Sequence, residues 1–235
     1  MICYAFPLAH EAGLLLKRCT QKESFTIDGV HLTLANFRSR RVLIALIGMG
    51  DAAARDSTET IFEYFRLRAF VLAGYGGALV PPLKVGQVLV SNNFTSEAVL
   101  GFLRMLSGFD FASFCMTDEV VGTPQQRDAY AQATKSQVAD METEAVAEVV
   151  LNHEIPFMAV RVISDDYPQV LPVGALAAGF DAPKGHATPF RLLGYLMTRP
   201  GEVVPFKKFV QGLTLARKNL TRFLEQLNKE LPGNW

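Results

Sequence analysis

Two short segments of the chain carry apolar side chains at consecutive positions, and they limit the folds open to it most. RVLIALIG (41–48) and RAFVLAG (68–74) lack the alternation of a strand that has one solvated face. Continuous apolar runs of this kind are typical of strands that helices cover on both sides. Segments of helical period separate them. We therefore predict an α/β fold of three layers, α/β/α, with a central mixed sheet, as one domain over 1–235 that ends in a helical segment from about 188.

The same patterns place the individual elements. The predicted strands are 1–6, 25–28, 31–37, 41–47, 68–74, 87–92, 113–120 and 157–163. The predicted helices are 9–21, 52–67, 95–106, 124–134, 142–153, 188–198 and about 203–230. Residues 166–187 have no clear period and are rich in Pro, Gly and Asp, so we expect a loop that is a candidate lid.

Composition narrows the classes of function. With 23 basic and 23 acidic residues, the chain has no formal net charge, so we expect a small-molecule ligand and no nucleic acid. Three scattered cysteines and four dispersed histidines fit neither a disulfide framework nor a metal site. No apolar run reaches the length of a membrane span, and no signal-peptide pattern opens the chain. We expect a cytoplasmic protein.

Glycines follow both apolar strands. Gly48 and Gly50 stand in LIGMGDAAA, and Gly74, Gly76 and Gly77 stand in LAGYGGAL. Glycines at strand ends let backbone amides approach a ligand, as in anion-binding loops. The spacing of a dinucleotide fingerprint or of a P-loop is missing, so neither NAD nor a P-loop nucleotide is indicated.

Acidic residues stand where an open α/β sheet places its ligands. Glu11 comes soon after the first strand, and Asp165 ends FMAVRVISD. The segment VADMETEAVAEVV adds Asp140, Glu142 and Glu144 at the start of a helix. Each of these carboxylates taken singly is better explained as a helix cap or a charge that favours a helix N-terminus. Their joint occurrence suggests a site.

Several of these motifs occur together in a known superfamily. PLAHEAGLL, GMG, AGYGGALVPPLKVGQVLVSNNF and above all DMETEAVA with IPFMAVRVISD resemble the nucleoside phosphorylase and methylthioadenosine/S-adenosylhomocysteine nucleosidase superfamily. The resemblance runs from residue 1 to about 166. The C-terminal segment from GYLMTRP onward is similar to the hopanoid-associated phosphorylase branch, with less distinctive motifs.

The resemblance implies cleavage of the N-glycosidic bond of a purine nucleoside, adenine first, with a modified 5′ position. Positive charge builds on the ribose and negative charge on the base as this bond breaks. By the family pattern, Asp165 is the general acid that protonates the base, and Glu11 activates the attacking water. Glu142 binds the ribose hydroxyls and Met141 packs on the sugar.

The resemblance also implies supporting residues. Val120 and Val121 flank the base together with Asp165, and Arg161 braces the acidic cluster. Gly48, Gly50, Gly74 and Gly76 belong to the loops that hold the nucleophile or an anion. The helical geometry of residues two apart favours Glu142 as the functional acid, with Asp140 and Glu144 as structural charges. The family implies no metal and no organic cofactor, and it suggests a homodimer.

The residues favour hydrolysis over phosphorolysis. The phosphorylase branch has an arginine and a serine where Leu72 and Tyr75 stand, so the phosphate pocket looks depleted. Two departures point away from the nucleosidases, which have a serine at the position of Ile47 and an aromatic residue at that of Val120. Other arginines could bind phosphate as co-substrate, although solvated surface charge is the better interpretation; they are Arg38, Arg40, Arg41 and Arg55.

Two further interpretations stay open. One is a nucleoside-binding protein without turnover. The other is a membrane-associated protein, because the chain has 17 phenylalanines and its last helix is amphipathic, with Phe206, Val210, Leu213, Leu220 and Leu224 on one stripe. Packing of that stripe on the sheet is the better interpretation, and membrane association is the weaker one.

Overall fold

A ten-stranded mixed sheet forms the centre of the computed structural model, which describes residues 1–181 and 186–232. In spatial order its strands are β2 (Cys19–Ile27), β3 (Val30–Phe37), β4 (Arg40–Leu46), β1 (Ile2–Phe6), β5 (Ala69–Ala78), β10 (Phe157–Asp165), β6 (Val88–Ser91) and β7 (Asp110–Ala112), while β9 (Val138–Asp140) pairs with β5 and with β8 (Phe114–Met116). The predicted α/β fold with a central mixed sheet is confirmed.

Four neighbouring strands, β4, β1, β5 and β10, are parallel to one another. They include both continuously apolar segments, and every residue of β1 and β10 is buried. Parallel strands end at the same edge of a sheet, and ligands of open α/β folds bind at that edge. The residues that follow β1 and that end β5 and β10 therefore lie near one another.

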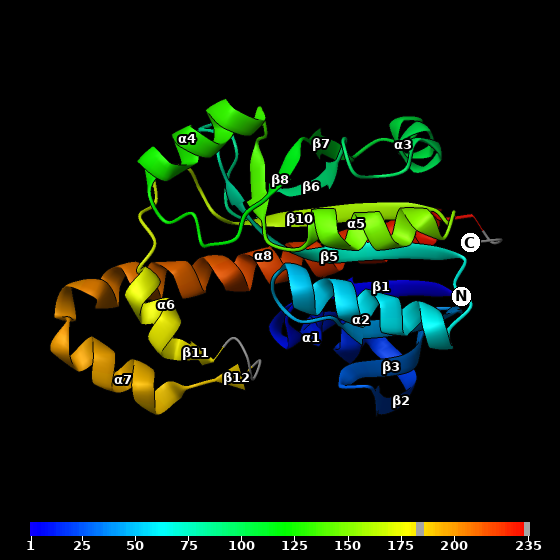
Figure 1. Ribbon diagram of the computed structural model, residues 1–235, viewed down its shortest axis with the longest axis horizontal. Helices are drawn as coiled ribbons and strands as arrows, with labels where there is room; N and C mark the ends of the chain where they lie inside the picture. The colour runs from blue at the N-terminus through cyan, green and yellow to red at the C-terminus, as the bar shows by residue number, and fades with distance from the viewer. Residues whose placement is uncertain (182–185, 233–235) are drawn as a thin grey trace.

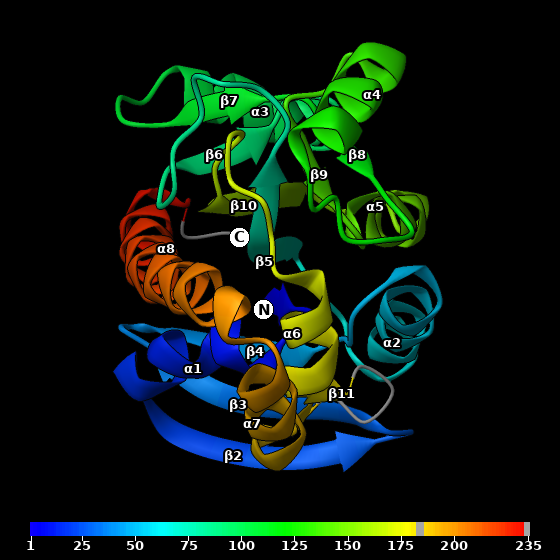
Figure 2. The ribbon, with the colours of Figure 1, turned by 90° about the vertical axis from the view of Figure 1, so that its left-hand side faces the viewer.

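Helices cover both faces of the sheet, as Figure 2 shows in a view along it. The helices are α1 (Ala9–Arg18), α2 (Asp51–Tyr64), α3 (Glu97–Arg104), α4 (Pro124–Thr134), α5 (Thr143–Asn152), α6 (Val173–Gly179), α7 (Pro189–Thr198) and α8 (Val203–Glu230). The apolar core on one face includes side chains of α1, α3 and α8, and the core on the other includes side chains of α2 and α5.

The last helix is tied to the sheet by its C-terminal half. Leu220 and Leu224 are buried, and the hydroxyl of Tyr4 in β1 donates to Asn228 Oδ1 at 3.2 Å. The N-terminal half of α8 extends past the sheet with α6 and α7 at the left of Figure 1. Val210, predicted on the packed stripe, lies in this half and is 42% exposed. The stripe prediction is therefore right for the second half of the helix and wrong at Val210.

Several predicted boundaries are wrong. The first helix ends at Arg18 and β2 starts at once at Cys19, because the polar, exposed residues 20–24 form an edge strand instead of a last helical turn and a loop. The short strands β7 and β9 lack a long apolar run and went unrecognised. The predicted lid 166–187 contains α6 and the pair β11 (Phe180–Asp181) and β12 (His186–Ala187), and 182–185 lie outside the described residues.

The region formed by α6, α7, the short 3-10 turn η1 (Pro200–Glu202) and the first turns of α8 is called the arm below. Within the described ranges, no helix is both long and apolar enough to cross a membrane.

Candidate active site

One pocket at the carboxyl edge of the parallel strands gathers the acids that the sequence singled out. Glu11, Glu142 and Asp165 all line it, although they are 131 and 23 positions apart along the chain. Met141, Val120, Val121 and Gly76 share the same lining. Gly48, Gly50, Gly74 and Arg161 stand behind it, outside the lining itself.

Glu11 lies in the first turn of α1 and is 2% exposed, so it is no solvent-facing cap. Its Oε1 accepts from the backbone N–H of Tyr75 at 2.7 Å, and its Oε2 accepts from that of Leu8 at 2.7 Å. Burial raises the pKa of Glu11 to about 8, although Arg161 and the two backbone donors oppose the shift. A carboxyl group with a pKa near neutrality is suited to act as a general base.

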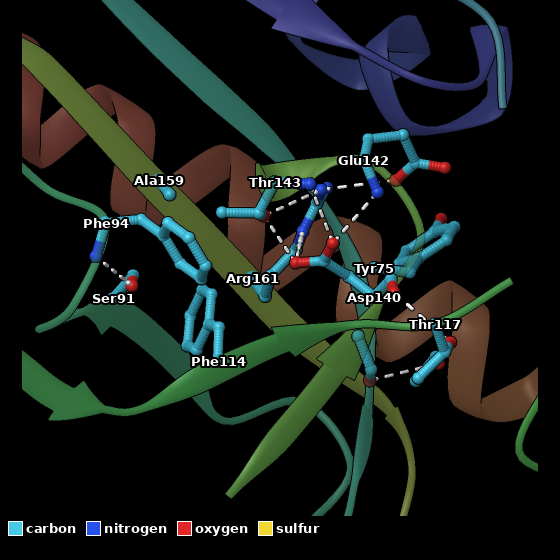
Figure 3. Close-up of polar contacts among 12 residues, drawn as sticks. Tyr75, Ser91, Phe94, Phe114, Thr117, Asp140, Glu142, Thr143, Ala159 and Arg161 are labelled. Carbon is cyan, nitrogen blue, oxygen red and sulfur yellow. Dashed lines mark hydrogen bonds and ion pairs between the residues drawn. The ribbon is translucent and has the colours of Figure 1, made fainter. Parts of the chain in front are cut away.

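Arg161 holds the central cluster of the site, shown in Figure 3. Its guanidinium is fully buried and donates from Nε to Asp140 Oδ2 at 3.0 Å and from Nη2 to Glu142 Oε2 at 3.2 Å. The same Nη2 donates to the hydroxyl of Thr143 at 3.2 Å. Since Glu142 Oε1 accepts from the N–H of Gly50 at 3.0 Å, both oxygens of this carboxylate are fixed. Burial raises the pKa of Glu142, and Arg161 opposes the rise.

Asp140 has a different set of partners from Glu142. Its Oδ1 accepts from the N–H groups of Glu142 at 2.9 Å and Thr143 at 2.8 Å, so it caps α5 from the end of β9. Glu144 is exposed. The helical argument for separating these acids was wrong, because Asp140 and Glu142 precede the helix and both contact Arg161. Their backbone positions at a strand end allow two acids to share one guanidinium.

Asp165 ends β10 and is paired with an arginine that the sequence analysis did not single out. Arg127 Nη2 lies 2.6 Å from Asp165 Oδ2, and the Ser164 hydroxyl donates to Oδ1 at 2.6 Å. Arg127 comes from α4, is fully buried, and also donates to the carbonyl oxygens of Ala78 at 2.9 Å and Asp166 at 3.0 Å. Burial raises the pKa of Asp165, with Arg127 and Ser164 opposing the rise.

No signal in the sequence separated Arg127 from the other arginines. It lies in PQQRDAYAQAT, a polar helix in which every other described side chain is at least partly exposed, so its pattern is that of a surface residue.

Apolar side chains line the rest of the pocket. Val121 is buried and Val120 is 39% exposed, on the segment that follows β8. Leu176 of α6 and Phe209 and Leu213 of α8 also line the pocket. The arm therefore contributes one apolar wall of the same pocket that holds the acids.

The two glycine motifs differ in structure. Gly48 and Gly50 have positive φ angles of 81° and 88°, so they form a true loop between β4 and α2. Gly74 and Gly76 lie within β5, so the prediction of a loop there is wrong. Their missing side chains make room for neighbours: a Cβ on Gly74 would lie 2.8 Å from Glu11 Oε1 and closer still to Arg161 Nη1.

The charge of the pocket lining is one-sided. Among the described residues it contains five carboxylates and no Arg, Lys or His; the acids are Glu11, Glu119, Asp140, Glu142 and Asp165. Of the arginines considered for phosphate, Arg40 donates to the backbone of Leu231, Arg41 to that of Gln21, and Arg55 pairs with Glu148 at 2.7 Å. Arg38 is also absent from the lining. Leu72 is buried in the core, and Tyr75 lines the pocket.

Known proteins share this fold. A futalosine hydrolase of Helicobacter pylori superposes with a TM-score of 0.74 at 16% identity, covering 98% of this chain and 97% of that one. An S-adenosylhomocysteine nucleosidase of Streptococcus pyogenes gives 0.71 at 16% identity, covering 98% and 97%. The chain has the fold of the nucleoside phosphorylase and nucleosidase superfamily. The likeness extends through the C-terminal arm.

Sequence comparison agrees with the structural one. A 5′-methylthioadenosine/S-adenosylhomocysteine nucleosidase of Shewanella denitrificans is 22% identical over 199 residues, which cover 69% of this chain and 85% of that protein. No family model matches the chain. The predicted superfamily is confirmed, and the hopanoid-associated branch stays a prediction. In the described part of the chain, no three His, Cys, Asp or Glu side chains form a group that could hold a metal ion.

Gly74 offers a test of the packing behind the acids. We expect Gly74→Ala to destabilise the protein by about 1–3 kcal/mol, because the added methyl group must displace Glu11 or Arg161. Gly101→Ala is the matched control, because Gly101 lies in helix α3 and a Cβ added there would have no neighbour within 4 Å. Chemical unfolding of both variants measures the difference, and equal stabilities would contradict the close contact.

The raised pKa of Glu11 predicts a pH-dependent stability. The folded protein binds the proton of Glu11 more tightly than the unfolded chain does. The resulting stabilisation of the fold is fully present below the ordinary pKa of 4.5 and is lost as the pH rises through about 8. Glu11→Gln should therefore gain several degrees in Tm relative to the wild type between about pH 5 and about pH 9. Glu144→Gln, which replaces an exposed acid, should show no such relative gain. A wild-type-like pH slope in Glu11→Gln would contradict the shift.

Proposed function

We propose that this chain is a purine nucleosidase, which hydrolyses the N-glycosidic bond of an adenine nucleoside modified at its 5′ position. The observation that carries the proposal is the joint position of Glu11, Glu142 and Asp165 on one pocket whose described lining has no basic side chain. Cleavage of this bond makes the sugar cationic, and carboxylates around it lower the barrier. The relatives named above are nucleosidases and a futalosine hydrolase, which supports the same reaction class.

Asp165 is the general acid for the departing base. It must carry a proton that it can deliver to the base, and burial raises its pKa in that direction. Val120 and Val121, which line the same pocket, supply apolar contacts beside the base. Ser164 and Arg127 hold the two oxygens of Asp165 by hydrogen bonds.

Glu142 and Met141 bind the ribose. Glu142 faces the pocket with an orientation that Gly50 and Arg161 determine, and its oxygens accept from the sugar hydroxyls. Met141 is its neighbour in the lining and packs on the sugar. Arg161 positions Glu142 from behind without reaching the pocket itself.

Glu11 binds the attacking water and takes its proton. The N–H donors of Leu8 and Tyr75 keep its carboxyl group in place, and a pKa of about 8 makes it a stronger base than an exposed carboxylate. Gly74 leaves room for Glu11 and Arg161, and Gly50 donates its N–H to Glu142. Gly48 and Gly76 stand beside them, in the same loop and the same strand.

Phosphorolysis is the alternative, and the electrostatics disfavour it. A phosphate dianion would enter a lining with five acidic side chains and no described basic one, so no side chain of the lining would neutralise its charge and every ionised carboxylate would repel it. Arginine, the usual partner of a bound phosphate, stands outside the lining at all four of the positions considered.

The 5′ substituent and the assembly are the finer parts of the proposal. Leu176, Phe209 and Leu213 give the pocket an apolar wall that suits an apolar 5′ group such as methylthio. We further propose a single catalytic domain over 1–235, a cytoplasmic location and a homodimer. These rest on the resemblance to the superfamily. A binding protein without turnover is the second candidate.

The direct test is release of free base. We expect the purified chain to liberate adenine from methylthioadenosine at the same rate with and without phosphate, because water is the nucleophile. Adenosine, inosine and futalosine are assayed in parallel by chromatography. Their relative rates of base release show which 5′ group and which base the protein prefers. Release that depends on phosphate would overturn hydrolysis in favour of phosphorolysis, and tight binding without release would identify a binding protein.

Asp165→Asn tests the acid role. We expect kcat to fall by about 10²–10⁴-fold with substrate affinity largely kept, because Asn cannot transfer the proton. The matched control is Asp166→Asn, whose side chain is outside the pocket lining. Because the variant leaves Arg127 without its carboxylate, its folding is checked by circular dichroism. A folded Asp165→Asn variant with near-normal kcat would exclude Asp165 as the general acid.

A further inference from the structure

The arm carries an apolar surface that no described part of the chain covers. In α7, Phe190 is 89% exposed, Leu193 59% and Met197 76%. Positions three and four residues apart share one face of a helix, so these three side chains form a single stripe. Val204, in the next helix, is 73% exposed. Large apolar side chains exposed together on one element mark an interaction surface.

The other side of α7 accounts for its packing. Tyr195 lies against Gly174 of α6, and Leu192 lies within 3.4 Å of the position that a Cβ on Gly179 would take. The hydroxyl of Tyr195 donates to Glu202 at 2.9 Å. Because α7 already packs on α6 through this side, the stripe is not required to hold the arm together. In Figure 1, α7 lies at the left-hand end of the molecule, away from the sheet.

Basic residues stand close to the stripe along the chain. Over 189–208 the chain has four basic residues and one acidic residue, whereas the whole chain is neutral. The basic residues are Arg191, Arg199, Lys207 and Lys208, and all four are exposed. The single acid, Glu202, is the one bound by Tyr195. The stripe therefore lies in a segment with an excess of basic residues, in a protein that is neutral as a whole.

This charge distinguishes between two occupants. A two-fold dimer through the stripe would bring each basic cluster against its own copy, because a two-fold axis places the same surface on both sides. Such like-charge contact is unfavourable. An anionic phospholipid surface matches both properties at once, since it accepts the apolar side chains below its headgroups and attracts the basic ones.

We propose that the arm docks the protein on anionic phospholipid membranes, with Phe190, Leu193 and Met197 inserted at the headgroup boundary. Helix α7 has ten residues and spans about 15 Å, so it lies along the surface and does not cross the bilayer. The basic residues contact the lipid phosphates, and their long aliphatic stems let them reach around the stripe. This property is independent of the proposed reaction.

The test is sedimentation of the full-length protein with vesicles. We expect it to pellet with vesicles of phosphatidylglycerol and phosphatidylcholine in equal parts and to stay in solution with phosphatidylcholine alone. Raising the salt to about 1 M, where the Debye length is about 3 Å, should weaken the binding. The triple variant Phe190→Ser, Leu193→Ser, Met197→Ser should bind at least about tenfold more weakly.

One control variant and one charge-reversal variant separate docking from nonspecific effects. Met105→Ser removes an apolar side chain that is 78% exposed outside the arm, and it should bind vesicles as the wild type does. Lys207→Glu, Lys208→Glu should lose the preference for anionic lipid. Wild-type protein that ignores anionic vesicles would overturn the proposal. A triple variant that pellets with anionic vesicles as the wild type does would also overturn it. If the wild type is a dimer and the triple variant a monomer, the stripe is a protein interface, and the proposal is overturned as well.

Discussion

The buried guanidinium of Arg161 is the interaction on which the site depends. Three acids interact with it: Asp140 and Glu142 form ion pairs with it, and its positive charge lowers the pKa of Glu11. Burial disfavours the charged forms of Glu11 and Glu142, and the charge of Arg161 offsets part of that effect. The strand sequence supports this placement, because Arg161 interrupts an otherwise apolar β10 and pairs in register with Gly74, whose missing side chain leaves room for the guanidinium.

The fold and the acids could be read from the sequence because both have local signatures. Continuous apolar runs indicated central parallel strands, and β4 and β5 are central. Glu11 and Asp165 follow or end predicted strands, and parallel strands bring their ends to one edge. Glu142 was singled out by the resemblance, because the strand before it, β9, was not predicted. Arg127 could not be read in this way. Its burial results from the packing of a polar helix, α4, over the end of β10, and no local pattern in the sequence encodes that contact.

The predictions for the short strands and for the arm were wrong for related reasons. β7 and β9 have three residues each, so they exist through pairing with β6, β8 and β5 and not through their own periodicity. Val210 fits the apolar stripe of α8, but this part of the helix extends past the sheet, so Val210 stays exposed. A helical pattern shows which residues share a face and not whether anything lies opposite that face. The same limit applies to α7, whose two apolar sides look alike in sequence although one alone is packed.

The pairing of Asp165 with Arg127 raises a chemical question, since an ion pair favours the carboxylate and the proposed reaction requires the acid. The geometry around Ser164 provides an answer. Its hydroxyl donates to Asp165 Oδ1 at 2.6 Å and also lies 3.3 Å from the carbonyl oxygen of Gly76. Rotation of this hydroxyl toward Gly76 turns Ser164 into an acceptor and leaves Oδ1 free to carry a proton. Arg127 keeps its bonds to the Ala78 and Asp166 carbonyls throughout, so it can hold Oδ2 while Oδ1 gains and delivers the proton. In the proposed reaction, Oδ2 would fix the position of the carboxyl group and Oδ1 would carry the proton.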